Sequence, residues 1–101
     1  MASKKVLQIF DDLIELHKAK DADYAGGDAL SNFRVAEKFG VPAWKGAAIR
    51  MADKWSRFVS LMGVEGPRVK EESIDDTLKD LAVYAIIVLA LRGERKEDIA
   101  L

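Results

Sequence analysis

The sequence predicts an all-α protein, a small helical bundle of three long helices and one short helix that is completed by oligomerisation. Apolar residues recur at spacings of three and four over long stretches, and only two prolines and seven glycines interrupt the chain. No segment alternates apolar and polar residues in the manner of a strand. With 101 residues, half of them hydrophobic, the chain suits one globular domain.

Composition also limits the classes of function. Sixteen basic and seventeen acidic residues leave a net charge of −1, so no overall field attracts duplex nucleic acid or an anionic membrane. The longest apolar run, residues 81–91, is shorter than the roughly 20 residues that cross a bilayer, which predicts a buried segment. The absence of cysteine excludes disulfides and thiolate metal sites, and it is compatible with the cytoplasm. The first residues show no signal-peptide pattern.

The first long helix is predicted over residues 4–20, with Ser3 as its N-cap. His17, the only histidine, falls on the apolar side of this helix and is predicted to be a packed residue instead of a ligand. An irregular loop with a Gly-Gly pair follows over residues 21–33. Loops of this length in a small protein tend to carry function.

A short helix is predicted over residues 33–39, capped by Ser31 or Asn32. Gly40 is expected to end it in a left-handed conformation, since glycine adopts positive φ without a steric cost. The helix and its stop form a compact link between the loop and the next long helix.

The next long helix is predicted to have Pro42 in its first turn and to run to about Met62, where Gly63 ends it. Its apolar stripe recurs at helical spacing, and both Trp44 and Trp55 on that stripe are predicted to lie in the core.

The last helix is predicted over residues 71–92, with Gly93 breaking it and a charged tail over 94–101. Beyond Leu81 this helix is apolar on every side. Three long helices give such a helix limited cover, so we expect the protein to form a homo-oligomer.

Acidic residues line one face of the last helix, because Glu72, Asp76 and Asp80 recur at four-residue spacing. This arrangement suits Mg²⁺, which prefers oxygen ligands and lets substrate phosphates complete its coordination shell. The alternative is a salt-bridge network with basic residues of the preceding helix, or a solvated first turn favoured by the helix dipole. The sequence leaves both interpretations open.

A basic stripe is predicted on the preceding helix, where Arg50, Asp53, Lys54 and Arg57 recur at i, i+3, i+4 and i+7. Two arginines and a lysine on one stripe suit the binding of phosphates. Asp53 would be a further metal ligand or would orient the arginines. The alternative is an ordinary charged helix face with pairs along the helix.

The loop and its margin supply candidate contacts to a base. Tyr24 and Phe33 would enclose a base, and Asn32 would read its edge or a ribose hydroxyl. The alternative is that the two aromatic residues close the top of the bundle. The chain contains no set of residues for a nucleophilic catalytic triad.

Taken together, these motifs resemble a known group. The motifs resemble those of small phage and bacterial helical domains associated with nucleotide modification. These domains are in turn distantly similar to the MazG-like all-α nucleoside triphosphate pyrophosphohydrolases. The resemblance covers residues 23–87. It rests on Asp23-Tyr24, Asn32-Phe33, Arg50-x-x-Asp53-Lys54-x-x-Arg57 and Glu72-Ser73-x-x-Asp76-Thr77-x-x-Asp80-Leu81-Ala82-x-Tyr84.

The resemblance implies an oligomeric helical enzyme that uses Mg²⁺, held by acids from two helices, to split a nucleoside triphosphate into monophosphate and pyrophosphate. Asp76 and Asp80 would stand at the family's second acidic pair, and with Asp53 and Glu72 they would hold the metal and support catalysis. Arg50, Lys54 and Arg57 would grip phosphates, while Tyr24 and Asn32 would contact the base or sugar.

One departure from the family pattern favours another function. The family's first acidic pair is Glu-x-x-Glu, whereas this chain offers the single acid Asp53 among basic residues. Losing an acid and gaining arginines favours holding phosphates over hydrolysing them. The alternative expectation is therefore a non-catalytic, nucleotide-binding homo-oligomer that sequesters a signalling nucleotide, in the host cytoplasm if the protein is encoded by a phage.

Overall fold

The computed structural model confirms the all-α fold: the residues that it describes, 2–22, 29–63 and 71–100, contain helices and no strand. Within those ranges, no helix combines the length and the apolar character that crossing a membrane requires. The elements in chain order are α1 (Lys4–Ala22), α2 (Ala29–Phe33), the 3-10 helix η1 (Arg34–Phe39), α3 (Ala43–Met62) and α4 (Glu71–Ala100).

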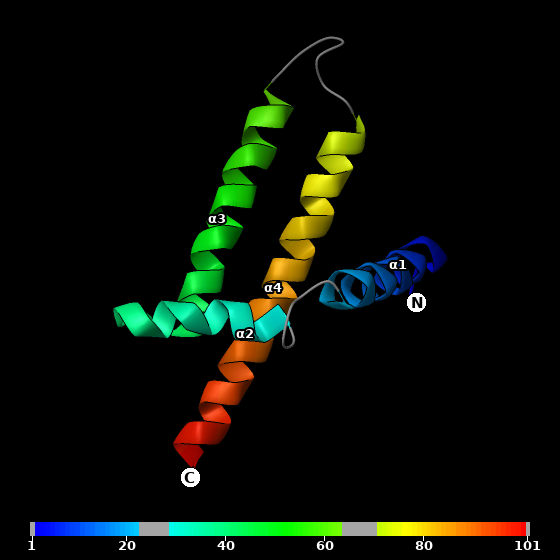
Figure 1. Ribbon diagram of the computed structural model, residues 1–101. Helices are drawn as coiled ribbons and strands as arrows, with labels where there is room; N and C mark the ends of the chain where they lie inside the picture. Colours follow the sequence, from blue (N-terminus) through cyan, green and yellow to red (C-terminus); the bar gives the residue numbers. More distant parts are fainter. Residues whose placement is uncertain (1, 23–28, 64–70, 101) are drawn as a thin grey trace.

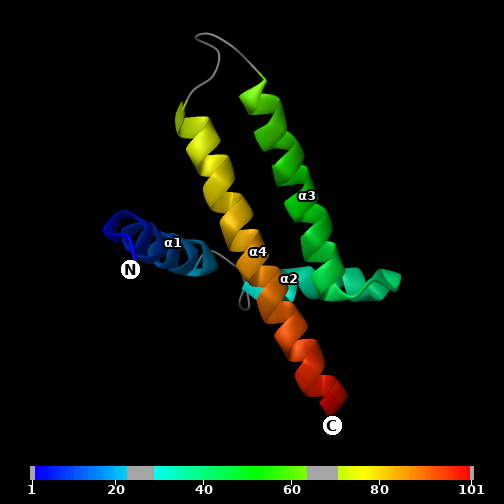
Figure 2. The ribbon, with the colours of Figure 1, turned by 180° about the vertical axis from the view of Figure 1, so that it is seen from behind.

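The two longest helices, α3 and α4, lie side by side and antiparallel, and they form the main body of the molecule (Figure 1). Helix α2 and η1 form one crosspiece over the end of this pair where α3 begins. Helix α1 projects to the side and packs chiefly against α4, which the view from behind also shows (Figure 2). The contact between α3 and α4 is by far the most extensive in the structure.

The N-terminus of α1 is capped as the sequence predicts. The Ser3 hydroxyl accepts a hydrogen bond from the backbone N–H of Val6 at 3.4 Å, and the Ser3 carbonyl accepts one from Leu7 at 3.0 Å. The helix then runs to Ala22, two residues beyond the predicted end.

The short helix differs from its prediction. Residues Arg34–Phe39 are helical, but they form a 3-10 helix, and α2 precedes them without a break. Ser31 and Asn32 therefore lie inside α2, and Phe33 occupies the N-cap position of η1 with no side-chain cap. The predicted loop is thus helical from residue 29 onward, while residues 23–28 lie outside the described part of the chain.

Gly40 ends η1 in the left-handed conformation that the sequence predicts, with φ of 76°. The helix stops cleanly because the N–H of Gly40 donates to the carbonyl of Glu37 and the N–H of Val41 donates to that of Ala36, both at 3.1 Å. Pro42 follows as the N-cap of α3, one position before the predicted first turn.

The prediction that Gly93 breaks the last helix is wrong, because α4 continues through it to Ala100. A glycine in a helix interior costs only about 1 kcal/mol relative to alanine. On one side of it, the Arg92 guanidinium lies 4.6 Å from the centre of the Trp44 ring; on the other, Glu94 pairs with Arg34. These tertiary contacts outweigh the local preference.

The core is small and lies where the crosspiece meets the pair of helices α3 and α4. Its buried members come from α2, α3 and α4, and Ala47 at its centre is fully buried. Trp44 packs against this core, whereas Trp55 is 56 % exposed, so the prediction that Trp55 is a core residue is wrong. The buried residues of the core are Phe33, Ala43, Ala47, Ile87 and Leu91.

The crosspiece approaches α3 closely at Gly46. A Cβ atom placed on Gly46 would lie 2.9 Å from the Cβ of Ala36, closer than real Cβ atoms come to a neighbour, and 4.0 Å from the carbonyl oxygen of Phe33. The absence of a side chain at Gly46 therefore allows η1 to rest on the backbone of α3.

Candidate functional site

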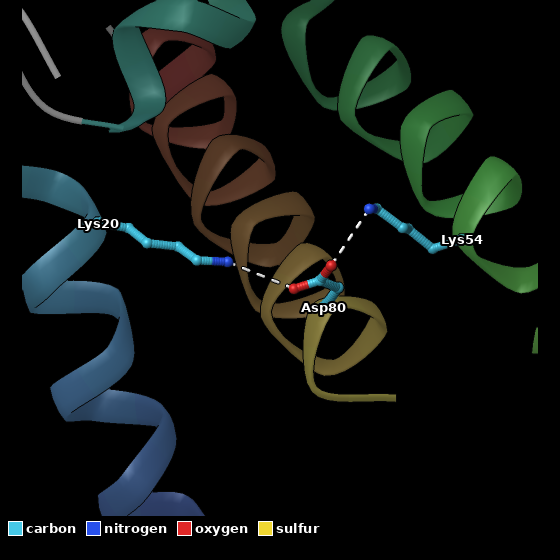
Figure 3. Close-up of polar contacts among 3 residues, drawn as sticks. All are labelled: Lys20, Lys54 and Asp80. Atoms are coloured by element: carbon cyan, nitrogen blue, oxygen red, sulfur yellow. Dashed lines mark hydrogen bonds and ion pairs between the residues drawn. The ribbon is translucent and has the colours of Figure 1, made fainter. Parts of the chain in front are cut away.

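A carboxylate in the middle of α4 joins three helices. Asp80 accepts from the Lys54 ammonium of α3 at 3.2 Å through Oδ2, and from the Lys20 ammonium of α1 at 3.4 Å through Oδ1 (Figure 3). The Asp80 side chain is 28 % exposed, so this group is partly shielded from solvent. The two ammonium groups therefore approach the carboxylate from opposite sides.

An aromatic and cationic cluster lies one turn further along α4. The rings of Phe33 and Tyr84 meet edge to face, with centroids 5.9 Å apart and an interplanar angle of 88°. The Arg50 guanidinium of α3 lies 5.7 Å from both ring centres. Cation–π contacts at this distance orient the arginine toward α4.

The two clusters border one hollow of about 150 Å³ between α1, α3 and α4. Its wall contains the lysines and the carboxylate of the first cluster, together with Phe33 and Tyr84 of the second. The hollow is smaller than the roughly 300–1,000 Å³ pockets that enclose whole ligands, so its size suits a group such as a phosphate better than a whole nucleotide. The remaining residues of the wall are His17, Val83 and Ile87.

The electrostatic balance of this site is positive. Lys20 and Lys54 bring two positive charges to the carboxylate of Asp80. Arg50 adds a third beside the rings of Phe33 and Tyr84. An anion that enters would meet cations from both α1 and α3. The arrangement can therefore bind a small, strongly charged anion, with an arginine and two aromatic faces beside it.

The structure brings together only some of the predicted site residues. Lys54 and Asp80 border the hollow, and Arg50 lies over the two aromatic rings of its wall. Among the ion pairs of the described residues, none involves the predicted site residues on the outer surfaces of α3 and α4, and Asn32 on α2 is exposed. Those outer residues are Asp53, Arg57 and Asp76, all exposed.

Two predicted site residues fall outside this description. Tyr24 lies outside the described residues, and so does the side chain of Glu72 in the first turn of α4.

The described residues do not fit a Mg²⁺ site. Over the ranges that the structure describes, no three carboxylate or histidine side chains come together as metal ligands. Both oxygens of Asp80 already accept from ammonium groups, and Asp76 one turn away is exposed. No chemical step through a metal is derived from this arrangement.

Lys20 and Tyr84 lie in the wall of the hollow and were not among the predicted site residues. Lys20 lies at the end of α1 and is 60 positions from Asp80 in sequence, so only the tertiary fold reveals the contact. Tyr84 follows Asp80 by four residues and shares its helix face, so the helical spacing of the acidic segment was a usable signal.

A larger hollow of about 480 Å³ lies under the corner between η1 and α3. Two of the charged residues in its wall pair with each other, since the Arg34 guanidinium donates to both oxygens of Glu94 at 2.8 and 2.9 Å. Arg92 covers the Trp44 ring in the same corner. These contacts hold α4 to the crosspiece, and we assign them to the fold.

The chain matches no protein-family model, no curated protein and no solved structure. The hollow beside Asp80 and the cations around it are therefore the basis for a functional proposal.

Proposed function

We propose that this protein binds nucleotides through their phosphate groups, at the hollow beside Asp80. The observation that carries the proposal is the convergence of Lys20 and Lys54 from two helices on a phosphate-sized hollow whose wall holds the Asp80 carboxylate. Arg50 adds a further positive charge beside the aromatic part of that wall. Phosphate oxygens accept strongly from such groups, and arginine can donate to two of them at once.

The base and sugar would lie outside the hollow, because its volume of about 150 Å³ accommodates little more than a phosphate. Arg50 on α3 and the exposed Asn32 on α2 lie on helices that also contribute residues to the wall of the hollow. As part of the proposal, the protein acts in the cytoplasm, since a chain without cysteine suits a reducing compartment.

Binding without turnover is the form of the proposal that the geometry favours. In this form the protein sequesters a nucleotide, and Asp80 serves as a placeholder that neutralises the lysines until a phosphate replaces it. The support is that both carboxylate oxygens already accept from ammonium groups, at 3.2 and 3.4 Å.

The second candidate is a nucleoside triphosphate pyrophosphohydrolase, as the resemblance implies. Asp76 and Asp80 stand one helical turn apart on α4, and Asp76 is exposed and able to take part in binding. This candidate requires Asp80 to leave the lysines and act on the substrate.

Calorimetric titration of the full chain with ATP, adenosine and inorganic pyrophosphate, each in Mg²⁺ and then in EDTA, tests the proposal. We expect ATP and pyrophosphate to bind in both buffers and adenosine to bind much more weakly, because the phosphates supply the contacts. Lys54→Met should weaken ATP binding by about tenfold, since a charge-assisted hydrogen bond contributes about 1.5 kcal/mol or more.

Lys79→Met is the matched control, because Lys79 is an exposed lysine of α4 next to Asp80 in sequence, and it should leave the affinity unchanged. The substitution Asp80→Asn separates the two candidates. A binding protein should hold ATP as tightly or more tightly once the competing carboxylate is gone, whereas the enzyme should lose pyrophosphate release. Failure of the unmodified chain to bind either phosphate compound would refute the proposal.

A further inference from the structure

An apolar surface spans α1 and the side of α4 next to it. We name it the α1/α4 face. Its members are each between 42 and 69 % exposed, although all are large and apolar. They recur at helical spacings on both helices, so they form two continuous stripes. The α1/α4 face consists of Val6, Leu7, Ile9, Phe10 and Ile14 on α1 and Ile86 on α4, together with Leu78 and Leu89 on the flank of α4 beyond Ile86.

Between the two stripes lies a groove of about 380 Å³. Its walls are side chains of α1, α4 and the start of the crosspiece, and they are almost wholly apolar. Lys18 stands at its margin and forms an ion pair with Glu15 at 3.5 Å, so charges border the apolar area. An apolar centre with a charged margin is typical of a protein interface. The groove is lined mainly by Phe10, Leu13, Ile14, Val83, Ile86 and Ala90.

The apolar side of α1 is too wide for its single neighbour to cover. At 3.6 residues per turn, its apolar residues occupy roughly half of the helix circumference. Leu13 is the only buried residue among the described side chains of α1, so α4 covers a narrow strip. Another surface must cover the remainder if this side is to leave water.

The area of the chain fits such a partner. A folded monomer of 11.2 kDa is expected to expose about 5,700 Å². The whole chain exposes 7837 Å², about 2,100 Å² more. The α1/α4 face supplies one part of this excess, and the end of α4 that projects beyond the crosspiece supplies another (Figure 1). One subunit of an obligate dimer buries on the order of 1,000–2,500 Å². The radius of gyration, 15.8 Å, likewise exceeds the about 13 Å expected for a compact chain of this length.

We propose that the α1/α4 face is the interface of a homodimer, with each copy laying its stripes into the groove of the other. Every copy carries the same exposed face, so a symmetric pair covers both at once. The net charge of −1 leaves little repulsion between copies. The proposal does not depend on nucleotide binding at Asp80.

Dimerisation would also fix the position of α1. Within its own chain this helix is held by Leu13 and by the pairing of Lys20 with Asp80, which is partly exposed. A second copy packed against the same helix would hold it from the other side. The interface would thus complete the hydrophobic cover that one chain lacks.

Sedimentation equilibrium of the full chain without nucleotide tests the interface. We expect a mass of twice 11.2 kDa across a wide range of concentrations. Ile86→Lys should weaken the dimer by about 100-fold or more, because the substitution occurs twice in a symmetric interface and places a charge in an apolar area.

Ile49→Lys is the matched control, since Ile49 is also an exposed isoleucine in mid-helix, at 61 %, but lies on α3. It should leave the mass unchanged, and circular dichroism should show both variants fully helical. If Ile86→Lys disturbs the fold, Leu89→Lys at the more exposed position takes its place. A monomeric unmodified chain, or a dimer that both α4 variants leave intact, overturns the proposal.

Discussion

Helix α4 makes two contacts of very different quality, one with α3 and one with α1. Against α3 it buries Ile87 and Leu91 beside Ala47, and the crosspiece closes the end of this core. Against α1 it buries little besides Leu13, and large apolar residues on both helices stay exposed. The contact with α3 is therefore a well-buried core, whereas the contact with α1 leaves most of its apolar residues exposed.

The difference shows how one helix can be apolar on every side and still be a surface helix. The sequence predicts a buried last helix, since residues 81–91 are uninterrupted and apolar. In one chain only the side toward α3 is well buried, while Ile86 and Leu89 are exposed. The proposed homodimer would cover the remaining apolar side of this helix.

The largest effect that sharpens the comparison is expected from the matched substitutions Leu91→Ala and Leu13→Ala. Leu91→Ala should lower the free energy of unfolding by about 3 kcal/mol, because it removes buried methyl groups that pack in the core with Ala47 and Ile87. Leu13→Ala should cost about 1–2 kcal/mol, since α1 can shift to fill the space.

Urea denaturation at one fixed protein concentration measures both changes, because dimerisation alters apparent stability. Hydrogen exchange adds the location: faster exchange confined to α1 in the Leu13 variant supports the contrast. Equal losses of stability at the two sites would remove it.

A smaller effect is expected from glycine to alanine substitutions in α3 and α4. Gly46→Ala should destabilise the protein by about 1 kcal/mol, because the close contact with Ala36 outweighs the gain in helix propensity. Gly93→Ala should stabilise it by about 0.5–1 kcal/mol, since a Cβ there meets nothing within 4 Å. Thermal unfolding of both variants checks the opposite signs, and stabilisation by both would contradict the close packing at Gly46.

The smallest effect on stability is expected from the two lysines that pair with Asp80, Lys54 on α3 and Lys20 on α1. Lys54→Met and Lys20→Met should each cost about 0.5 kcal/mol, as partly exposed ion pairs contribute little. Lys54 should cost slightly more, because it is 34 % exposed and Lys20 is 55 % exposed. Removing both should exceed the sum of the single losses, since Asp80 would keep no cation.

Denaturation of the single and double variants at low and high salt measures these terms. Salt should reduce the contribution of Lys20 more than that of Lys54, because the more exposed pair is screened more strongly. Strict additivity of the two losses would show that the lysines do not share Asp80 in solution.

The fold was largely predictable because the long helices carry their own signals. The N-cap at Ser3, the left-handed stop at Gly40 and the end at Gly63 are local, and all three occur where the sequence places them. The errors arise where tertiary contacts outweigh local preference. Gly93 stays helical because Arg92 and Glu94 are held from outside the helix.

The candidate site was less predictable than the fold. The meeting of Lys54 with Asp80 follows from opposite charges on two antiparallel helices, which the sequence suggests. Lys20 carries no such signal, since its partner lies 60 residues away and on another helix. Trp55 lies on the apolar stripe of α3, as its spacing predicts, but it is exposed. The part of α3 that faces the core is instead centred on the buried Ala47.

The missing methyl group at Gly46 has a consequence for the position of Phe33 in the crosspiece. The crosspiece formed by α2 and η1 is fixed to α3 at two points, the turn at Gly40 and the contact of Ala36 with Gly46. Phe33 belongs to the crosspiece and forms part of the wall of the hollow beside Asp80. The close approach at Gly46 therefore also affects the hollow. A side chain at position 46 that moved the crosspiece away from α3 would displace the ring of Phe33 and change the wall of the hollow.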